Sequence, residues 1–229
     1  TAACSPYEDR ITPADPGGTA LDFTVTQTPG HDNEVTLESK TPGVISYWDY
    51  VYGFSNKQKV TVTIPFKGEF YVKYSAYADG GPKTDSVKVS ISEKDKYYFS
   101  SPMWKLLTNA EAGKTWVWAV DIPGGACMGN GSGGAVKPEW WAVGSDYLKS
   151  VNAVNDEMTF DLDKNFNFTF SSNGKTTKAS FTLDTLNQTL KINGADISQG
   201  AKATYVVVKL NENELTLAQQ GDGWRKIYM

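Results

Sequence analysis

Short segments in which apolar and polar residues alternate run through most of the chain. From LDFTVTQ (21–27) to SVKVSIS (86–92), the pattern supports six or seven segments within about 80 residues. Side chains of an extended strand point alternately to its two faces, so this pattern predicts β-strands with one buried face. Turn residues separate the segments about every 8 to 12 positions, which is typical of an immunoglobulin-sized β-sandwich.

The pattern changes after SEKDKYYFSSP (92–102) and then resumes. A segment MWKLLTNAEAGKTWVWAVD (103–121) leads into a glycine-rich loop, and alternating segments run from DEMTFDLD (156–163) to WRKIYM (224–229). No stretch shows a sustained helical period, so the prediction is all-β, with a second sandwich of about 130 residues. We therefore divide the chain into a terminal segment (1–18), a first domain (19–97) and a second domain (98–229).

Composition narrows the classes of function. The 229 residues carry a net charge of −4 and form no Lys/Arg cluster, which disfavours a nucleic-acid partner or an anionic membrane surface. The single histidine, His31, excludes a multi-histidine zinc site, and its loop context predicts a solvated side chain. Aromatic residues make up 13%, a supply that sugar recognition would draw on, although β-proteins use aromatics heavily in any case.

The two cysteines suggest different roles. Cys4 follows the small residues of TAAC and precedes an acidic, proline-rich stretch, which resembles the end of a bacterial lipoprotein signal. The resemblance implies that Cys4 carries the lipid and that residues 5–18 form a tether, although Thr1 stands where such signals usually have Leu. Cys127 is then expected to be a free, buried thiol.

The dipeptide Trp140–Trp141 in PEWWAVG (138–144) is the strongest candidate for binding. Neighbouring side chains of an extended segment point to opposite faces, so at least one ring is expected near solvent. A sugar presents an apolar face and a rim of hydroxyls, and it therefore suits exposed aromatic rings flanked by polar groups. The candidate glycan-binding residues are Trp140, Trp141, Asn130, Glu139, Asp146 and Tyr147. We expect one ring of the pair to pack the loop onto the sandwich.

The other tryptophans of the second domain are assigned to packing. Trp116 and Trp118 lie two apart on one strand face and are expected in the core, while Trp104 and Trp224 are expected to pack near a domain junction, strand or turn.

Catalysis and metal binding find less support. Glu157 and Asp161 share a strand face, but four residues separate them by roughly 13 Å, which is too far for a glycosidase pair. Asp161 and Asp163 are closer together, but they lie next to a turn and no aromatic residue stands beside them to stack against a sugar. We therefore expect no catalytic residues and no cofactor. A structural Ca²⁺ on the same acidic stretch is an alternative, but no ligand-spaced loop appears.

Two stretches of the first domain resemble a PKD-type immunoglobulin-like domain. They are YWDYVYGFS (47–55) and FKGEFYVKYSAYADGG (66–81), with Val51-Tyr52 in place of the usual short turn. The resemblance implies that Trp48 is a buried packing residue. By alternation, Tyr50, Tyr52 and Phe54 are expected in the core or at its edge.

The chain as a whole resembles two-domain surface lipoproteins of Bacteroidota glycan-utilisation loci, in which a jelly-roll-like domain follows the PKD-like one. The resemblance is carried by TPGVISYWDY, SSPMWKLLTNAEAGKTWVWAVD, PEWW and NDEMTFDLD. It implies a non-catalytic, monomeric protein, exposed on the outer membrane through its Cys4 lipid, that captures polysaccharide or oligosaccharide for an outer-membrane transporter. Two alternatives stay open. A jelly-roll glycoside hydrolase needs a carboxylate pair beside exposed tryptophans, and a structural or adhesive protein predicts both Trp140 and Trp141 buried.

Overall fold

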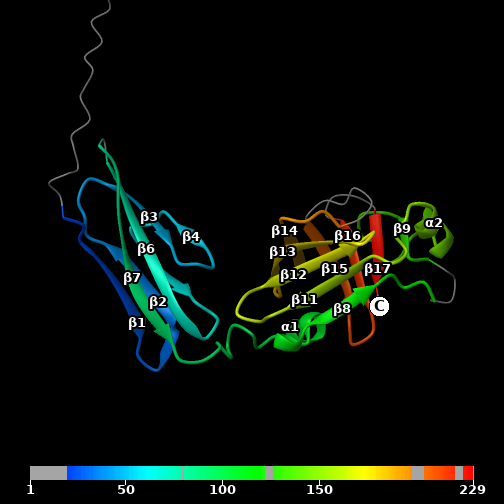
Figure 1. Ribbon diagram of the computed structural model, residues 1–229, viewed down its shortest axis with the longest axis horizontal. Helices are drawn as coiled ribbons and strands as arrows, with labels where there is room; N and C mark the ends of the chain where they lie inside the picture. Colours follow the sequence, from blue (N-terminus) through cyan, green and yellow to red (C-terminus); the bar gives the residue numbers. More distant parts are fainter. Residues whose placement is uncertain (1–19, 79, 122–125, 198–203, 220–223, 229) are drawn as a thin grey trace, which may run out of the picture. The chain divides into compact units, whose positions relative to one another are not determined.

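The chain divides into two compact units, residues 1–96 and 97–229, in the computed structural model (Figure 1). The structure describes residues 20–78, 80–121, 126–197, 204–219 and the backbone of 224–228. Cys4, the expected tether and the side chain of Trp224 lie outside the described residues. The described strands pair antiparallel throughout, so the all-β prediction is confirmed.

The first unit consists of two sheets. The three-stranded sheet has the order β1-β2-β5, and the four-stranded sheet has the order β4-β3-β6-β7. The strands are β1 (Phe23–Thr28), β2 (His31–Ser39), β3 (Ile45–Asp49), β4 (Phe54–Ser55), β5 (Lys59–Thr63), β6 (Gly68–Ala78) and β7 (Gly81–Ile91). One core cluster draws residues from both sheets, which makes this unit a β-sandwich.

Trp48 lies fully buried in this core, as expected. Its ring packs on Tyr74, with 4.4 Å between the ring centroids, and its Nε1 donates a hydrogen bond to the carbonyl of Lys57 at 3.0 Å. The prediction for Phe54 was wrong, because its side chain is 63% exposed. Simple alternation fails because Val51 adopts a positive φ of 74° and the Tyr50 N–H bonds to the Gly53 carbonyl, which reverses the chain before Phe54.

The second unit contains one ten-stranded sheet, in the order β10-β9-β17-β16-β15-β14-β13-β12-β11-β8. Its strands are β8 (Lys114–Val117), β9 (Met128–Asn130), β10 (Trp141–Val143), β11 (Glu157–Asp161), β12 (Asn167–Ser172), β13 (Lys175–Asp184), β14 (Thr189–Asn193), β15 (Thr204–Leu210), β16 (Leu215–Gln219) and β17 (Trp224–Tyr228).

From β11 to β17, strands that are adjacent in sequence are also adjacent in the sheet. A jelly roll instead has Greek-key crossings between two sheets, so this pairing does not confirm a jelly-roll-like domain. Short turns explain the difference. Asn173 and Gly174, between β12 and β13, both have positive φ, which joins two strands directly as a hairpin.

Helices are the elements that alternation did not predict. Helix α1 (Pro102–Thr108) begins at Ser101, whose Oγ accepts the Met103 N–H, and has proline in its first turn. A short 3₁₀ turn (Ala110–Ala112) follows it, and α2 (Ser145–Ser150) follows β10. Helix α1 packs against β8, β11 and β15, with Trp104 and Leu107 buried. Both α-helices are too short for a sustained period to appear in the sequence.

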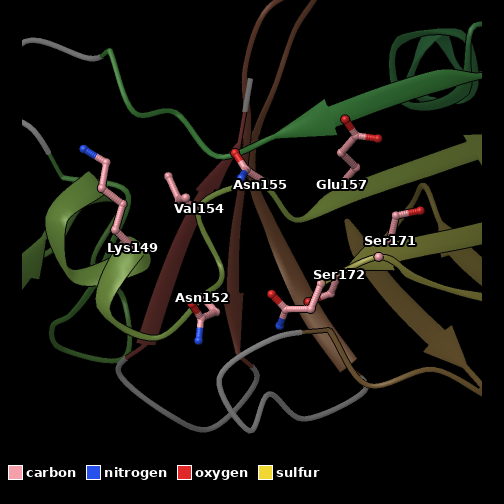
Figure 2. Close-up of a pocket in the computed structure, with 9 residues that line it drawn as sticks. Lys149, Asn152, Val154, Asn155, Glu157, Ser171 and Ser172 are labelled. Atoms are coloured by element: carbon pink, nitrogen blue, oxygen red, sulfur yellow. The ribbon is translucent and has the colours of Figure 1, made fainter.

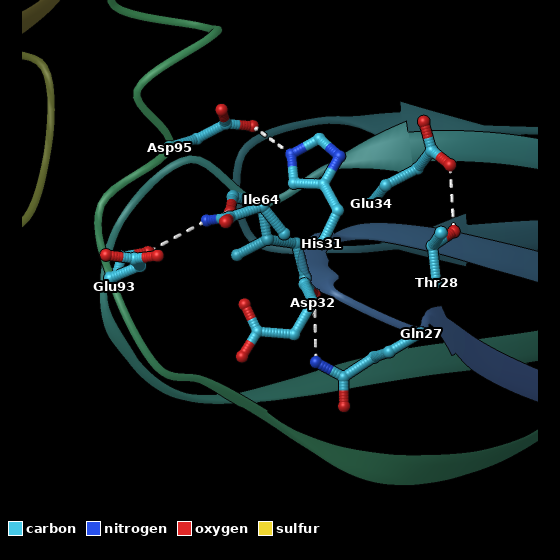
Figure 3. A network of polar contacts seen from close by, with 9 residues as sticks. Gln27, Thr28, His31, Asp32, Glu34, Ile64, Glu93 and Asp95 are labelled. Atoms are coloured by element: carbon cyan, nitrogen blue, oxygen red, sulfur yellow. Dashed lines mark hydrogen bonds and ion pairs between the residues drawn. The ribbon is translucent and has the colours of Figure 1, made fainter.

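The prediction of a solvated His31 was wrong. Its Nε2 lies 3.0 Å from Oδ2 of Asp95, a carboxylate that is only 3% exposed (Figure 3). Nearby, the buried Asn33 Nδ2 donates to the carbonyls of Ile64 and Glu93, each at 3.0 Å. These contacts fix the last residues of the first unit against the start of β2. His31 and Asp95 are 64 positions apart, so local sequence gives no signal of the pair.

Candidate functional site

Two adjacent tryptophan rings are exposed at one edge of the ten-stranded sheet. Trp140 is 70% exposed, and Trp141 is 39% exposed. The expectation that at least one ring reaches solvent is confirmed, and Trp141 is the more covered of the two rings. Trp141 begins β10, the outermost strand, which pairs on one side with β9.

The backbone around the two rings is held tightly. The carbonyl of Asn130 accepts hydrogen bonds from the N–H groups of both Glu139, at 2.9 Å, and Trp140, at 3.0 Å. Trp141 is the cross-strand partner of Asn130. At the other end of the pairing, the Cys127 N–H donates to the Val143 carbonyl at 2.7 Å. The two rings therefore stand on a paired segment of backbone.

Gly129 permits this close pairing. A Cβ atom at this position would lie 2.3 Å from the carbonyl oxygen of Trp141 and 2.5 Å from Cβ of Pro138. Such distances are well inside ordinary contact, so any side chain would push the β10 segment away from β9. The glycine is therefore required for the observed position of Trp141.

Helix α2 adds a third ring to the cluster. Tyr147 meets Trp141 edge to face, with 5.6 Å between ring centroids and 88° between ring planes. The fully buried Leu148 anchors the helix, while the side chain of Asp146 is fully exposed and lies 3.5 Å from Lys149. We call Trp140, Trp141 and Tyr147 the tryptophan cluster.

Two of the predicted polar contacts also shape the loop. Oε2 of Glu139 accepts the Ser132 N–H at 2.9 Å, and Oδ1 of Asn130 accepts the Gly131 N–H at 2.8 Å. These bonds close the loop between β9 and β10. The six predicted residues therefore lie on one continuous structure, the β9–β10 segment and the helix after it, with the carboxylates of Glu139 and Asp146 at its exposed surface.

A polar pocket that the sequence did not reveal begins at the end of α2. It has a volume of about 330 Å³ and is rich in amides and hydroxyls (Figure 2). The main polar residues are Lys149, Asn152, Asn155, Glu157, Ser171 and Asn173. Helix α2 is common to both features, because Tyr147 touches Trp141 and Lys149 lines the pocket. The pocket draws on α2, β11 and the β12–β13 turn, so only folding assembles it.

Other aromatic residues of the second unit fill its core. Trp116 and Trp118, predicted as core residues, are 0% and 2% exposed. Trp104 is also buried, with Tyr98, Phe99, Phe166 and Phe181 around it. Cys127 is a free, buried thiol, and burial raises its pKa above the ordinary value. Trp104, Trp116, Trp118 and Cys127 therefore belong to the packed interior of this unit.

The acidic stretch considered for catalysis serves a turn. Oδ1 of Asp161 accepts hydrogen bonds from the Asp163 N–H at 2.9 Å and from Nδ2 of Asn167 at 2.7 Å. Within the described ranges, no group of three or more His, Cys, Asp and Glu side chains is placed to hold a metal ion. Among the same residues, no helix is long and apolar enough to cross a membrane.

No model of a known protein family matches the chain, and no curated protein matches it significantly.

Proposed function

We propose that the protein is a non-catalytic glycan-binding protein, anchored at the cell surface by a lipid on Cys4, that captures polysaccharide for a glycan-utilisation system. The first unit would be a PKD-type immunoglobulin-like domain, an assignment supported by its seven strands in two sheets and by the buried Trp48. The second unit would present the glycan site.

The exposure of the tryptophan cluster is the observation that carries this proposal. Large aromatic rings are usually buried, and two adjacent exposed tryptophans on a restrained backbone favour a binding surface. The apolar face of a sugar ring stacks on such rings, while its hydroxyls pair with carboxylates and amides. Glu139, Asp146 and the pocket beyond α2 offer those partners close by in the chain.

Two of the competing functions fit this geometry less well. A structural or adhesive protein is expected to bury both rings, whereas Trp140 and Trp141 are 70% and 39% exposed. A glycosidase needs two carboxyl groups about 5 to 9.5 Å apart around one bond. Asp161 is occupied in its turn, and Glu157 lines a pocket whose described lining includes no second carboxylate.

Native affinity electrophoresis of the full chain tests the proposal. The gels would contain amylopectin, xyloglucan, barley β-glucan, arabinoxylan, galactomannan or mucin, and the chain would be compared with Trp140→Ala/Trp141→Ala. We expect one polysaccharide to retard the wild type and to retard the double variant much less, because stacking on the two rings is lost. Trp140 and Trp141 are exposed, so the fold should survive, which circular dichroism checks.

The matched control replaces Leu186, an exposed apolar residue at 89%, with alanine. This variant should be retarded like the wild type. Retardation by no polysaccharide would refute the proposed function. Retardation of the double variant as strong as that of the wild type would refute the tryptophan cluster as its site.

A further inference from the structure

A second group of exposed aromatic residues lies on the first unit. Ile45, Tyr47, Phe54 and Tyr77 are 69%, 37%, 63% and 44% exposed, and we call them the β3–β4 aromatic face. The Tyr47 and Phe54 rings are nearly parallel, with 24° between their planes and 5.7 Å between centroids. Tyr77 meets Tyr47 edge to face at 6.4 Å. The Tyr47 and Phe54 rings thus stack on each other, and the Tyr77 ring stands perpendicular to that of Tyr47.

The strand pattern places these side chains together. Along β3, Ser46 and Trp48 point into the core, while Ile45 and Tyr47 point outward. Ile45 pairs across the sheet with Tyr77, which brings β6 into the same surface.

Phe54 reaches this surface through the turn before β4. The Val51 N–H bonds to Oδ1 of Asp49 at 3.0 Å, and Phe54 then pairs with Asp49 at the sheet edge. After β4, the Lys57 N–H donates to Oγ of Ser55 at 3.2 Å. The rings therefore sit on a backbone that is fixed before any ligand arrives, which lowers the entropic cost of binding.

The surroundings of the rings are polar. Asp49 and Lys73 form a cross-strand pair beside Tyr47 on the outward face. Ser75, opposite Tyr47, shares a hydrogen bond of 2.8 Å with Thr84. Charged side chains thus lie beside the rings, whereas Ser75 is buried.

A pocket of about 690 Å³ adjoins the same edge. Its polar lining includes Lys40, Thr41, Ser46, Asn56 and Gln58. Ile45 belongs to both the pocket and the aromatic face, and Asn56 follows Phe54 by two residues. The side chains of Lys40, Asn56 and Gln58 are exposed and supply this pocket with an ammonium group and two amides, whereas Thr41 and Ser46 are buried.

We propose that the β3–β4 aromatic face and its adjoining pocket form a second carbohydrate-binding site, which rests on the proposed function of the protein as a glycan binder. An apolar helix would need a continuous apolar groove, whereas here aromatic rings are bordered by amides and charges. That combination matches the amphipathic surface of a sugar chain. The first unit is then a binding module as well as a spacer.

Isothermal titration of the full chain tests the second site. The titrant is a short oligosaccharide of whichever polysaccharide in the panel above retards the wild type. We expect about two oligosaccharides to bind per chain, and about one to bind after Tyr47→Ala/Phe54→Ala. In gels, the Trp140→Ala/Trp141→Ala variant should retain a weak retardation that the combined four-residue variant loses.

Tyr71→Ala is the matched control, because Tyr71 is 61% exposed on the same face of β6 but lies six residues from Tyr77, about 20 Å along the strand. Tyr71→Ala should leave the number of oligosaccharides bound per chain unchanged. Phe54→Tyr keeps an aromatic ring, so this variant should also bind about two oligosaccharides per chain. Suppose that a polysaccharide retards the wild type, but Tyr47→Ala/Phe54→Ala binds as many oligosaccharides per chain as the wild type. That result would overturn the second site alone. Absence of any wild-type retardation would overturn both proposals.

Discussion

Replacing Gly129 by alanine should loosen the segment that carries the tryptophan cluster. The new Cβ would lie 2.3 Å from the Trp141 carbonyl oxygen and within 2.6 Å of two Pro138 ring atoms. None of these atoms is the far end of a flexible side chain. An ordinary contact is about 3.4 Å, so β10 must retreat from β9 by about 1 Å.

The energetic cost follows from two opposing terms. Overpacking of a closely fitted site costs about 1–3 kcal/mol, and we take about 2 kcal/mol here. Replacing glycine by alanine also restricts the unfolded chain, which offsets about 0.5 kcal/mol. We therefore expect the free energy of unfolding of the second unit to fall by about 1.5 kcal/mol. Because the retreat weakens the bond from Cys127 to Val143, local opening should increase more than global stability falls.

Urea unfolding and hydrogen exchange measure the two effects. Peptides that cover residues 127–143 should exchange faster in Gly129→Ala, while peptides from β12 and β13 should change little. The control is Gly134→Ala, because a Cβ at that glycine of the same loop meets nothing within 4 Å. If Gly129→Ala matches the wild type in both unfolding and exchange, the close approach of β10 to β9 is refuted.

Three further predictions concern stability. Trp116→Ala should lower the free energy of unfolding, measured in urea, by about 3–5 kcal/mol because the ring is fully buried. Trp140→Ala should lower it by under about 0.5 kcal/mol. Equal losses would contradict the assigned burial. Asn33→Ala removes the donor to two carbonyls and should cost about 2 kcal/mol, and an unchanged unfolding midpoint would refute that role. Burial raises the pKa of Tyr52 from 10.0 to about 12, so the folded state holds this proton more tightly. Its stabilising contribution is complete below pH 10 and is lost as the pH rises through 12. In urea unfolding, the free energy of unfolding should therefore fall less between pH 10 and 12 in Tyr52→Phe than in the wild type.

Alternation predicted most strands because each has one buried face. Val35 and Leu37 on β2, and Phe168 and Phe170 on β12, show the period directly. It failed at Phe54 because backbone dihedral angles at Val51 changed the direction of the chain without changing the hydrophobic pattern. Alternation indicates which face of a strand a side chain occupies, but it gives no information on a turn that reverses the chain.

Strand order and remote contacts were beyond the same pattern. Two-sheet and single-sheet arrangements both require alternating strands, so the ten-stranded sheet follows from pairing rather than from periodicity. The contact between His31 and Asp95 joins positions 64 apart, and the pocket near Glu157 joins three separate elements. For the candidate site, the position of Trp140 next to Trp141 in the sequence correctly predicted an exposed ring. The two residues lie where β10 begins, at the edge of the sheet.

The two exposed aromatic groups share a feature that bears on solubility. Phe54 lies on β4, of two residues, and Trp141 begins β10, of three, and each strand is the outermost of its sheet. A long, apolar outermost strand is a template on which other chains add and aggregate. Strands this short offer too few backbone donors and acceptors to seed that growth. At these two sheet edges, the protein can therefore display exposed aromatic rings without offering a long strand to which other chains could add.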